Sequence, residues 1–272
     1  RIAHLCKADL VTQMVKEFPE LQGVMGREYA RLSGEPEAVA RGIYEHYLPR
    51  YSGDELPQTL EGALVSLADR LDTLAGCLAT GIQPTGSQDP YGLRRQAQGM
   101  VTILLEHKIE VSLQSLLKEA LAVPASRAGL TPAQHKAVFS SLIKFVNGRI
   151  DFLLQEKGFS SEVIAAATAV PFGSVVELYE RASALEKHLN SKMLQDIVTA
   201  YHRVANLAKS SPGGEVNPSW FEMEAERNLY RSYLEARERL ELELPGRRYG
   251  ACLALLQELR EPLDCFFDQV LV

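Results

Sequence analysis

Two acidic residues in an otherwise apolar segment give the clearest chemical signal in this sequence. Asp69 and Asp72 lie three positions apart in a stretch that is predicted to be helical over 58–80, so they occupy neighbouring positions on one helix face. A carboxylate on an apolar helix is costly unless it is paired or coordinates a ligand. The pattern therefore indicates either a coordinating site or a hydrogen-bonded carboxylate inside a helical bundle.

The residues around this pair resemble the second half of the HD-domain superfamily of phosphohydrolases. That family has a His-bearing helix, a loop rich in Gly and Pro, and a helix that reads Ala-Asp-x-x-Asp. The corresponding segments here are Glu45-His46-Tyr47-Leu48-Pro49, Ser52-Gly53-Asp54-Glu55-Leu56-Pro57 and Ala68-Asp69-Arg70-Leu71-Asp72. By this resemblance, Asp69 matches the last metal-binding Asp and His46 matches a later His ligand.

The first half of the HD pattern is incomplete. The His-Asp dyad of the family falls on Ala8-Asp9, so its His is replaced by Ala8. Catalytic metal sites need several convergent nitrogen and oxygen ligands with supporting neighbours. We therefore expect Asp9, His46 and Asp69 to be a remnant that binds no metal and forms hydrogen bonds within the bundle. A working metal-dependent phosphohydrolase of the HD type is the enzymatic alternative.

A second signal is a flexible loop that leads into a basic helix start. The segment 81–90 is rich in Gly, Pro, Ser and Asp, and Arg94 and Arg95 follow it in a helix that is predicted over 90–107 with Asp89 as a plausible N-cap. A helix N-terminus favours anions, and Arg can bind phosphate in a bidentate fork. The segment indicates an anion site, or alternatively a capped helix whose arginines are solvated.

A third signal is a polar stripe on the helix that is predicted over 191–209. Its members are Lys192, Thr199, Arg203, Asn206 and Ser210. Tyr201 and His202 flank the stripe, and such a mixture suits single-stranded RNA, whose bases stack on aromatic rings and hydrogen-bond at their edges. A weaker patch of the same kind is Arg247-Arg248-Tyr249. A solvated helix face is the ordinary alternative for both.

The elements that must position these residues are helical nearly throughout, because apolar residues recur every three or four positions. The predicted helices cover 2–18, 20–33, 36–48, 58–80, 90–107, 111–122, 132–157, 160–169, 174–189, 191–209, 218–244, 246–260 and 262–270. Thr131 and Gln134 have the spacing of a capping box. The fold class is therefore all-α. Residues 123–131 are the best candidate boundary, which predicts one helical bundle over 1–125 and a second over 126–272, and 210–218 is the most linker-like segment.

Composition excludes several function classes. The chain has 272 residues and a net charge of −6, which argues against a nonspecific nucleic-acid binder. Four widely spaced cysteines make no zinc motif, and no apolar run is long enough to span a bilayer. There is no nucleophile elbow, Walker loop, dinucleotide fingerprint or HExxH motif. We therefore expect a cytoplasmic binding module. Because the first residue is Arg1 rather than Met, we expect a part of a longer protein.

The order of several motifs resembles the β subunit of bacterial heterotetrameric glycyl-tRNA synthetase. The motifs in the first half are Lys7-Ala8-Asp9-Leu10-Val11-Thr12, Glu17-Phe18, Glu20 to Gly26, His46-Tyr47-Leu48-Pro49-Arg50, Gly53 to Pro57, Ala68 to Leu74, Pro84 to Pro90 and Leu93-Arg94-Arg95. Those in the second half are His202 to Asn206 and Pro262 to Asp268. The likeness covers nearly the whole chain in a single order.

This resemblance implies the C-terminal portion of that subunit, with an HD-like domain over 1–125 and connecting helices plus a DALR-type anticodon-binding domain over 126–272. The core of the second domain would begin at about 190, and its last helix would be missing after Val272. The implied partners are tRNA(Gly) and the α subunit, with no membrane and no DNA. The complete enzyme would activate glycine with ATP and Mg on the α subunit, and this segment would be non-catalytic and bind no cofactor.

The implied tRNA-binding residues are basic or polar side chains of the basic helix start, the polar stripe and the weaker basic patch described above. They are Arg94, Arg95, Lys192, Arg203, Asn206, Arg247 and Arg248. Two departures from the family weaken the expected contacts, because Gln88 and His202 stand where Lys is commoner. A helical scaffold that docks the α subunit without binding RNA is the remaining alternative.

Overall fold

A computed structural model describes residues 1–86, 88–209 and 213–270. The expected all-α fold is confirmed, with 71% of the residues in helices and no strand within these ranges. Ser87 of the predicted anion loop, Ser210 of the polar stripe and part of the expected linker over 210–218 lie outside them. No helix in the described ranges is both long and apolar enough to cross a membrane.

The chain divides into two compact units. The N-terminal unit comprises Arg1–Gly158 and Pro171–Tyr179, and the C-terminal unit comprises Phe159–Val170 and Glu180–Val272. This division differs from the boundary expected after residue 125, which falls inside helix α7 (Leu113–Arg127). The physical reason is a shared core, since buried Leu121 and Ala125 of α7 pack with Ala75 of α5 (Leu60–Ala79) and with Val138 of α8 (Pro132–Glu156). Of the segment 123–131, the first five residues belong to α7, and the rest connects it to the packed helix α8.

Short helices form the first part of the N-terminal unit. They are α1 (Ile2–Leu5), η1 (Ala8–Val11), α2 (Gln13–Glu17), η2 (Pro19–Leu21), α3 (Val24–Leu32) and α4 (Glu37–Glu45). The continuous helix predicted over 2–18 is wrong, because Thr12 is extended and caps α2 through a hydrogen bond from the Val15 amide. A small core of Ala30, Ala40 and Ile43 then holds α3 and α4 together.

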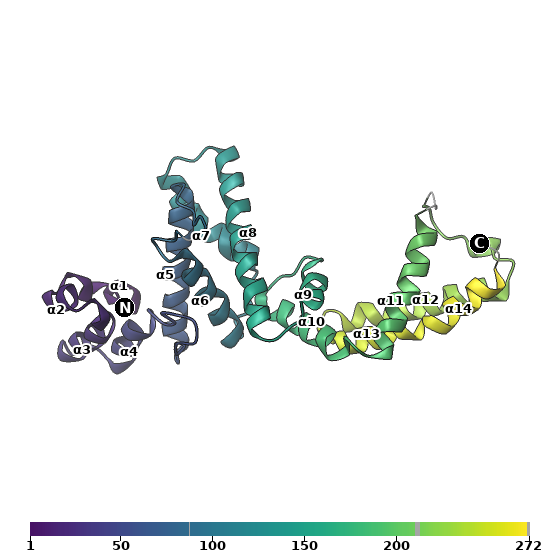
Figure 1. The fold of residues 1–272 in the computed structure, drawn as a ribbon, viewed down its shortest axis with the longest axis horizontal. Coiled ribbons are helices and arrows are strands. Elements are labelled where there is room, and N and C mark those ends of the chain that lie inside the picture. Colours follow the sequence, from purple (N-terminus) through teal and green to yellow (C-terminus); the bar gives the residue numbers. More distant parts are fainter. Residues whose placement is uncertain (87, 210–212, 271–272) are drawn as a thin grey trace. The chain divides into compact units, whose positions relative to one another are not determined.

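Longer helices form the rest of this unit, and Figure 1 shows α5, α6, α7 and α8 in one bundle. Helix α6 (Leu93–Glu106) begins three residues later than Pro90, because Gly92 takes a left-handed conformation with φ of 62°. Asp89 still caps it, since its carboxylate accepts from the amides of Leu93 at 2.7 Å and Arg94 at 3.0 Å. The capping box of Thr131 and Gln134 at the start of α8 is confirmed.

The C-terminal unit has a thinner core. Its helices are α9 (Ser161–Thr168), the later part of α10 (Val175–His188), α11 (Lys192–Ala208), η3 (Pro218–Trp220), α12 (Glu224–Glu243), α13 (Tyr249–Glu258) and α14 (Arg260–Gln269). Helices α11 and α12 both pack against α13 and α14 (Figure 1). Leu253 and Leu255 of α13 are buried, whereas α11 and α14 contribute no buried residue among those described.

Candidate functional site

His46 and Asp69 lie together in the N-terminal unit, and a lysine lines the same cavity. Both residues line a cavity of about 430 Å³, together with Lys7. The Nζ atom of Lys7 is 2.9 Å from Oδ2 of Asp69 and lies 4.5 Å from the centre of the Tyr47 ring. The ammonium group therefore already supplies the positive charge that a metal ion would bring to Asp69. Asp72 points to solvent, so it carries no burial cost.

His46 is buried at the end of α4 and is uncharged near neutral pH. Its Nδ1 donates to the carbonyl oxygen of Ile43 at 2.5 Å, and its buried Nε2 has no hydrogen-bond partner. Burial, and after it the nearby charge of Lys7, lower the pKa of His46 to about 4. A free imidazole nitrogen remains, but the neighbouring ammonium group disfavours a second cation beside it.

Asp9 faces a different cavity, so the three residues matched to the HD site do not converge. Asp9 is only 2% exposed and lines a cavity of about 560 Å³ that also includes Ala8. Its Oδ2 accepts from the Gly23 amide at 2.6 Å, while its buried Oδ1 has no partner. No group of three or more His, Cys, Asp and Glu side chains could hold a metal ion in the part of the chain that the structure describes. The residues present do not fit the divalent metal of an HD-type site.

Arg70, which no motif in the sequence indicated, connects the segment after α4 with α5 and α6 through its hydrogen bonds. It is 5% exposed, and its guanidinium donates to the carbonyl oxygens of Tyr47 and Pro49 at 3.2 and 2.7 Å. It also donates to Ser66 on α5 and Gln96 on α6. Burial lowers the pKa of Arg70 to about 10. The signal that could have found it is a charged residue on the apolar side of the helix that carries Asp69.

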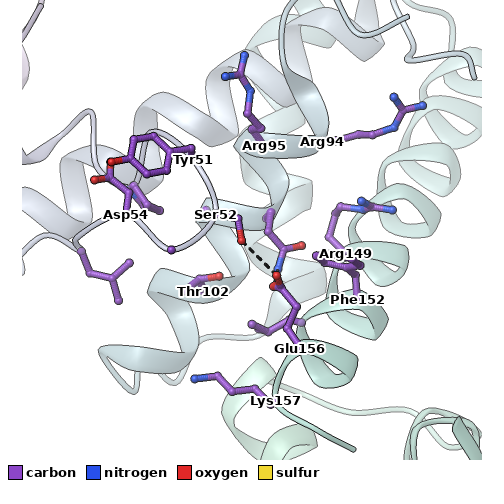
Figure 2. A pocket seen from close by; sticks show the side chains of 16 residues that line it. Tyr51, Ser52, Asp54, Arg94, Arg95, Thr102, Arg149, Phe152, Glu156 and Lys157 are labelled. Carbon is purple, nitrogen blue, oxygen red and sulfur yellow. Dashed lines mark hydrogen bonds between the residues drawn. The ribbon is translucent and has the colours of Figure 1, made fainter. Parts of the chain in front are cut away.

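Arg94 and Arg95 line a third cavity, which brings together α6 and α8. Its volume is about 470 Å³, and Arg149 and Lys157 add two more basic side chains from α8 or just after it. Figure 2 shows Arg94 and Arg95 at the top of the view, Arg149 to the side and Lys157 below. Arg94 also donates to the carbonyl oxygen of Gly86 at 2.8 Å. Arg149 and Lys157 were missed because no local motif connects them to the α6 arginines.

An exposed carboxylate also lines this cavity. Glu156 accepts from Ser52 at 3.1 Å and from the side-chain amide of Gln98 at 3.4 Å (Figure 2). Lys157 pairs with Glu106 rather than with Glu156. The lining of the cavity therefore combines several arginines with one hydrogen-bonded carboxylate.

In the C-terminal unit, the structure gives the predicted RNA-binding residues protein partners. Arg203 of α11 binds Asp264 of α14 at 2.5 Å, and its guanidinium lies 4.3 Å from the centre of the Phe267 ring. Asn206 accepts from Lys209 at 3.0 Å, while Lys192 is exposed at the start of α11. Arg203, the central cation of the predicted stripe, is therefore already paired with a carboxylate.

The weaker basic patch is also paired. Arg247, whose φ is 53°, lies 3.4 Å from Glu180, and Arg248 pairs with Glu243. An anion that binds either arginine must compete with these carboxylates. The α6 arginines are better placed for an external anion, because no carboxylate is seen bonded to Arg94 or Arg95 within the described residues.

Comparisons with known proteins agree on one family. A family model described as the glycyl-tRNA synthetase beta subunit matches residues 1–169. The chain is 46% identical over 272 residues to the glycine–tRNA ligase beta subunit of Desulforudis audaxviator, and about 41% identical to those of Halalkalibacterium halodurans and Syntrophus aciditrophicus. Each match covers the whole of this chain but only 39% of the relative's length. The chain thus spans about two-fifths of the curated relatives it matches.

Proposed function

Because the chain belongs to the glycyl-tRNA synthetase beta subunit family, we propose that it is a tRNA-recognition segment of glycine–tRNA ligase and performs no chemistry itself. The observation that carries this proposal is the cavity between α6 and α8, where Arg94, Arg95 and Arg149 gather on a chain with a net charge of −6. Such a local concentration of arginines favours a polyanionic partner.

The two units would contribute differently to RNA binding. Arg94 and Arg95 would neutralise phosphates, and phosphate contacts position a protein on RNA without reading its sequence. In the proposed anticodon-binding part, Lys192 is open to solvent, whereas Arg203 would have to exchange Asp264 for a phosphate. We therefore expect the C-terminal unit to bind RNA weakly by itself and with strong dependence on salt.

The assembly that we propose follows from the family. The chain would act in the cytoplasm with an α subunit that activates glycine with ATP and Mg, and the shared substrate would be tRNA(Gly). An HD-like domain over the first helices and a DALR-type domain over the last remain part of this proposal. The HD-type hydrolase alternative is disfavoured, because Lys7 neutralises Asp69 and Asp9 faces another cavity.

A second candidate function is a scaffold that docks the α subunit. An exposed apolar face on the first short helices favours it, since Val11 is 90% exposed and Met14 and Phe18 are 41% and 47% exposed. Large apolar side chains that gather at a surface often mark a protein interface. Co-purification of the chain with the α subunit, without any effect of its arginines on tRNA, would favour this candidate over RNA recognition.

Charge changes in the complete α and β enzyme test the proposed function. We expect Arg94→Glu and Arg203→Gln each to raise KM for tRNA about tenfold while glycine-dependent ATP–pyrophosphate exchange stays unchanged. Each lost phosphate contact should also make the plot of log affinity against log salt shallower by about one unit. The matched control is Arg127→Glu, because Arg127 is exposed at the end of α7. It lines neither the cavity of Arg94 and Arg95 nor the cavity of His46 and Asp69.

The result that contradicts the proposal is equally direct. If Arg94→Glu and Arg203→Gln leave KM for tRNA at the value of the Arg127→Glu control, tRNA does not contact either unit through these residues. Equal affinity of the enzyme for tRNA and for heparin would also count against specific recognition. Circular dichroism of each variant checks that its helices are retained.

A further inference from the structure

The cavity between α6 and α8 combines three kinds of group that a simple phosphate site does not need. Its lining includes the guanidinium groups of Arg94 and Arg95 and the exposed carboxylate of Glu156. Two buried polar atoms in its lining, Nε of Arg149 and Oε1 of Gln98, have no hydrogen-bond partner. Buried polar atoms are nearly always paired, so an unpaired donor and an unpaired acceptor in one cavity indicate an external partner with both functions.

Two aromatic rings border the same cavity. Tyr51 is 59% exposed and Phe152 is 41% exposed, and Figure 2 shows them on opposite sides of the view. A guanidinium lies near each ring, with Arg50 5.9 Å from the centre of Tyr51 and Arg149 5.7 Å from that of Phe152. Exposed aromatic faces beside arginines are the usual stacking surfaces for unpaired bases.

We propose that this cavity binds one unstacked nucleotide of single-stranded RNA, an inference that rests on the proposed function. The phosphate lies at Arg94 and Arg95, and the base stacks on Phe152 or Tyr51. The base edge lies beside the side chains of Gln98 and Arg149, which line the same cavity. The volume of about 470 Å³ falls within the range of about 300–1,000 Å³ that is common for small-molecule sites.

The exposed carboxylate of Glu156 adds a preference between bases. Glu156 is acceptor-only when ionised, so it favours an exocyclic amino group. Cytosine and adenine present such a donor on the Watson–Crick edge, whereas uracil presents a carbonyl oxygen at the corresponding position of cytosine. The carboxylate of Glu156 also repels additional negative charge in the cavity, which disfavours a purely polyanionic ligand such as an acidic peptide. The cavity should therefore prefer cytidine to uridine.

The probe for this test is fluorescein-labelled hexacytidylate RNA, titrated into the complete α and β enzyme and followed by fluorescence anisotropy. We expect Phe152→Ala to weaken binding of hexacytidylate about tenfold, as removal of one stacking surface does elsewhere. The matched control is Tyr91→Ala, since Tyr91 is 55% exposed in the same unit and lines no part of the cavity. Tyr51→Ala is the second variant, because Tyr51 lies in a loop where truncation leaves the helices intact.

Base preference gives an independent readout. The unmodified enzyme should bind hexacytidylate several-fold more tightly than hexauridylate, and Glu156→Gln should reduce that ratio, since its amide group can donate to uracil O4. The inference is overturned if hexacytidylate does not bind, if neither Phe152→Ala nor Tyr51→Ala weakens binding relative to Tyr91→Ala, or if heparin fragments of equal charge bind as tightly.

The two proposals fail in different ways. If Arg94→Glu raises KM for tRNA but Phe152→Ala leaves hexacytidylate binding at the control value, the nucleotide pocket is wrong and tRNA recognition stands. If hexacytidylate binding depends on Phe152 and Tyr51 while no charge change affects KM for tRNA, the cavity binds RNA. The proposal that this segment recognises tRNA is then contradicted.

Discussion

Acidification should destabilise the N-terminal unit through a single histidine, His46. The side chain is 1% exposed, and its pKa falls from 6.5 to about 4 because burial and the charge of Lys7 disfavour the protonated ring. The unfolded chain therefore binds a proton at His46 between pH 6.5 and 4 that the folded chain does not bind. Since the unfolded state binds more protons in this window, the free energy of unfolding is highest above pH 6.5 and falls as the pH decreases toward 4.

The magnitude follows from the depressed pKa of His46. Each pKa unit corresponds to about 1.4 kcal/mol, so the full loss between pH 6.5 and pH 4 is about 3 kcal/mol, and about 2 kcal/mol of it is reached by pH 5. The assay is urea unfolding at pH 7.5, 6.0 and 5.0, followed by circular dichroism. His46→Gln removes the titrating group and keeps a hydrogen-bond donor near the carbonyl oxygen of Ile43, so it should lose less free energy of unfolding on acidification than the unmodified chain.

Two further variants complete the test of His46. Lys7→Met removes the neighbouring positive charge and should make the dependence on pH shallower, whereas Lys118→Met, an exposed lysine on α7, should leave it as in the unmodified chain. If the unmodified chain and His46→Gln lose the same free energy of unfolding between pH 7.5 and pH 5.0, burial of a neutral His46 is not the cause, and the reasoning is refuted.

Two stability predictions concern Arg70 and Thr131. Arg70→Ala removes the donors to the carbonyl oxygens of Tyr47 and Pro49 and leaves a void. We therefore expect the free energy of unfolding to fall by about 3–5 kcal/mol. The control Arg127→Ala, at an exposed position, should lower it by less than about 0.5 kcal/mol. Equal urea midpoints for these two variants would show that the Arg70 hydrogen bonds do not stabilise the fold. Thr131→Ala removes the N-cap of α8 and should lower the free energy of unfolding by about 1 kcal/mol in the same assay, and an unchanged midpoint would mean that the capping box contributes nothing.

Interactions between residues close in sequence could be predicted well. The capping box of Thr131 and Gln134 and the cap by Asp89 were both visible as patterns, and both are present. These interactions depend on backbone geometry within one helical turn, which residue type and spacing largely determine. The prediction of one long helix over 2–18 failed at Thr12, where a hydroxyl that can cap a new helix outweighed apolar periodicity.

The candidate site was predictable only in part. Asp69 and His46 were found from motifs and do line one cavity, but nothing local indicated that Lys7 would pair with Asp69 or that Asp9 would face elsewhere. Lys7 and Asp69 are far apart in sequence, so their contact depends on how the first short helices pack against α5. The division between the two units also depends on contacts between distant segments. Because α5, α7 and α8 share a core, this division lies well after residue 125.

The amino-acid sequence by itself determined the helical class, most helix starts and the family, because each depends on residue types at short, regular spacings or on motif order. Tertiary structure alone decided which charges remain available. Arg149 joins Arg94 in a cavity, whereas Arg203 is bound by Asp264. The physical reason is that the charge state of a site is set by neighbours across helix interfaces, and a modest rotation of a packed helix exchanges one set of neighbours for another.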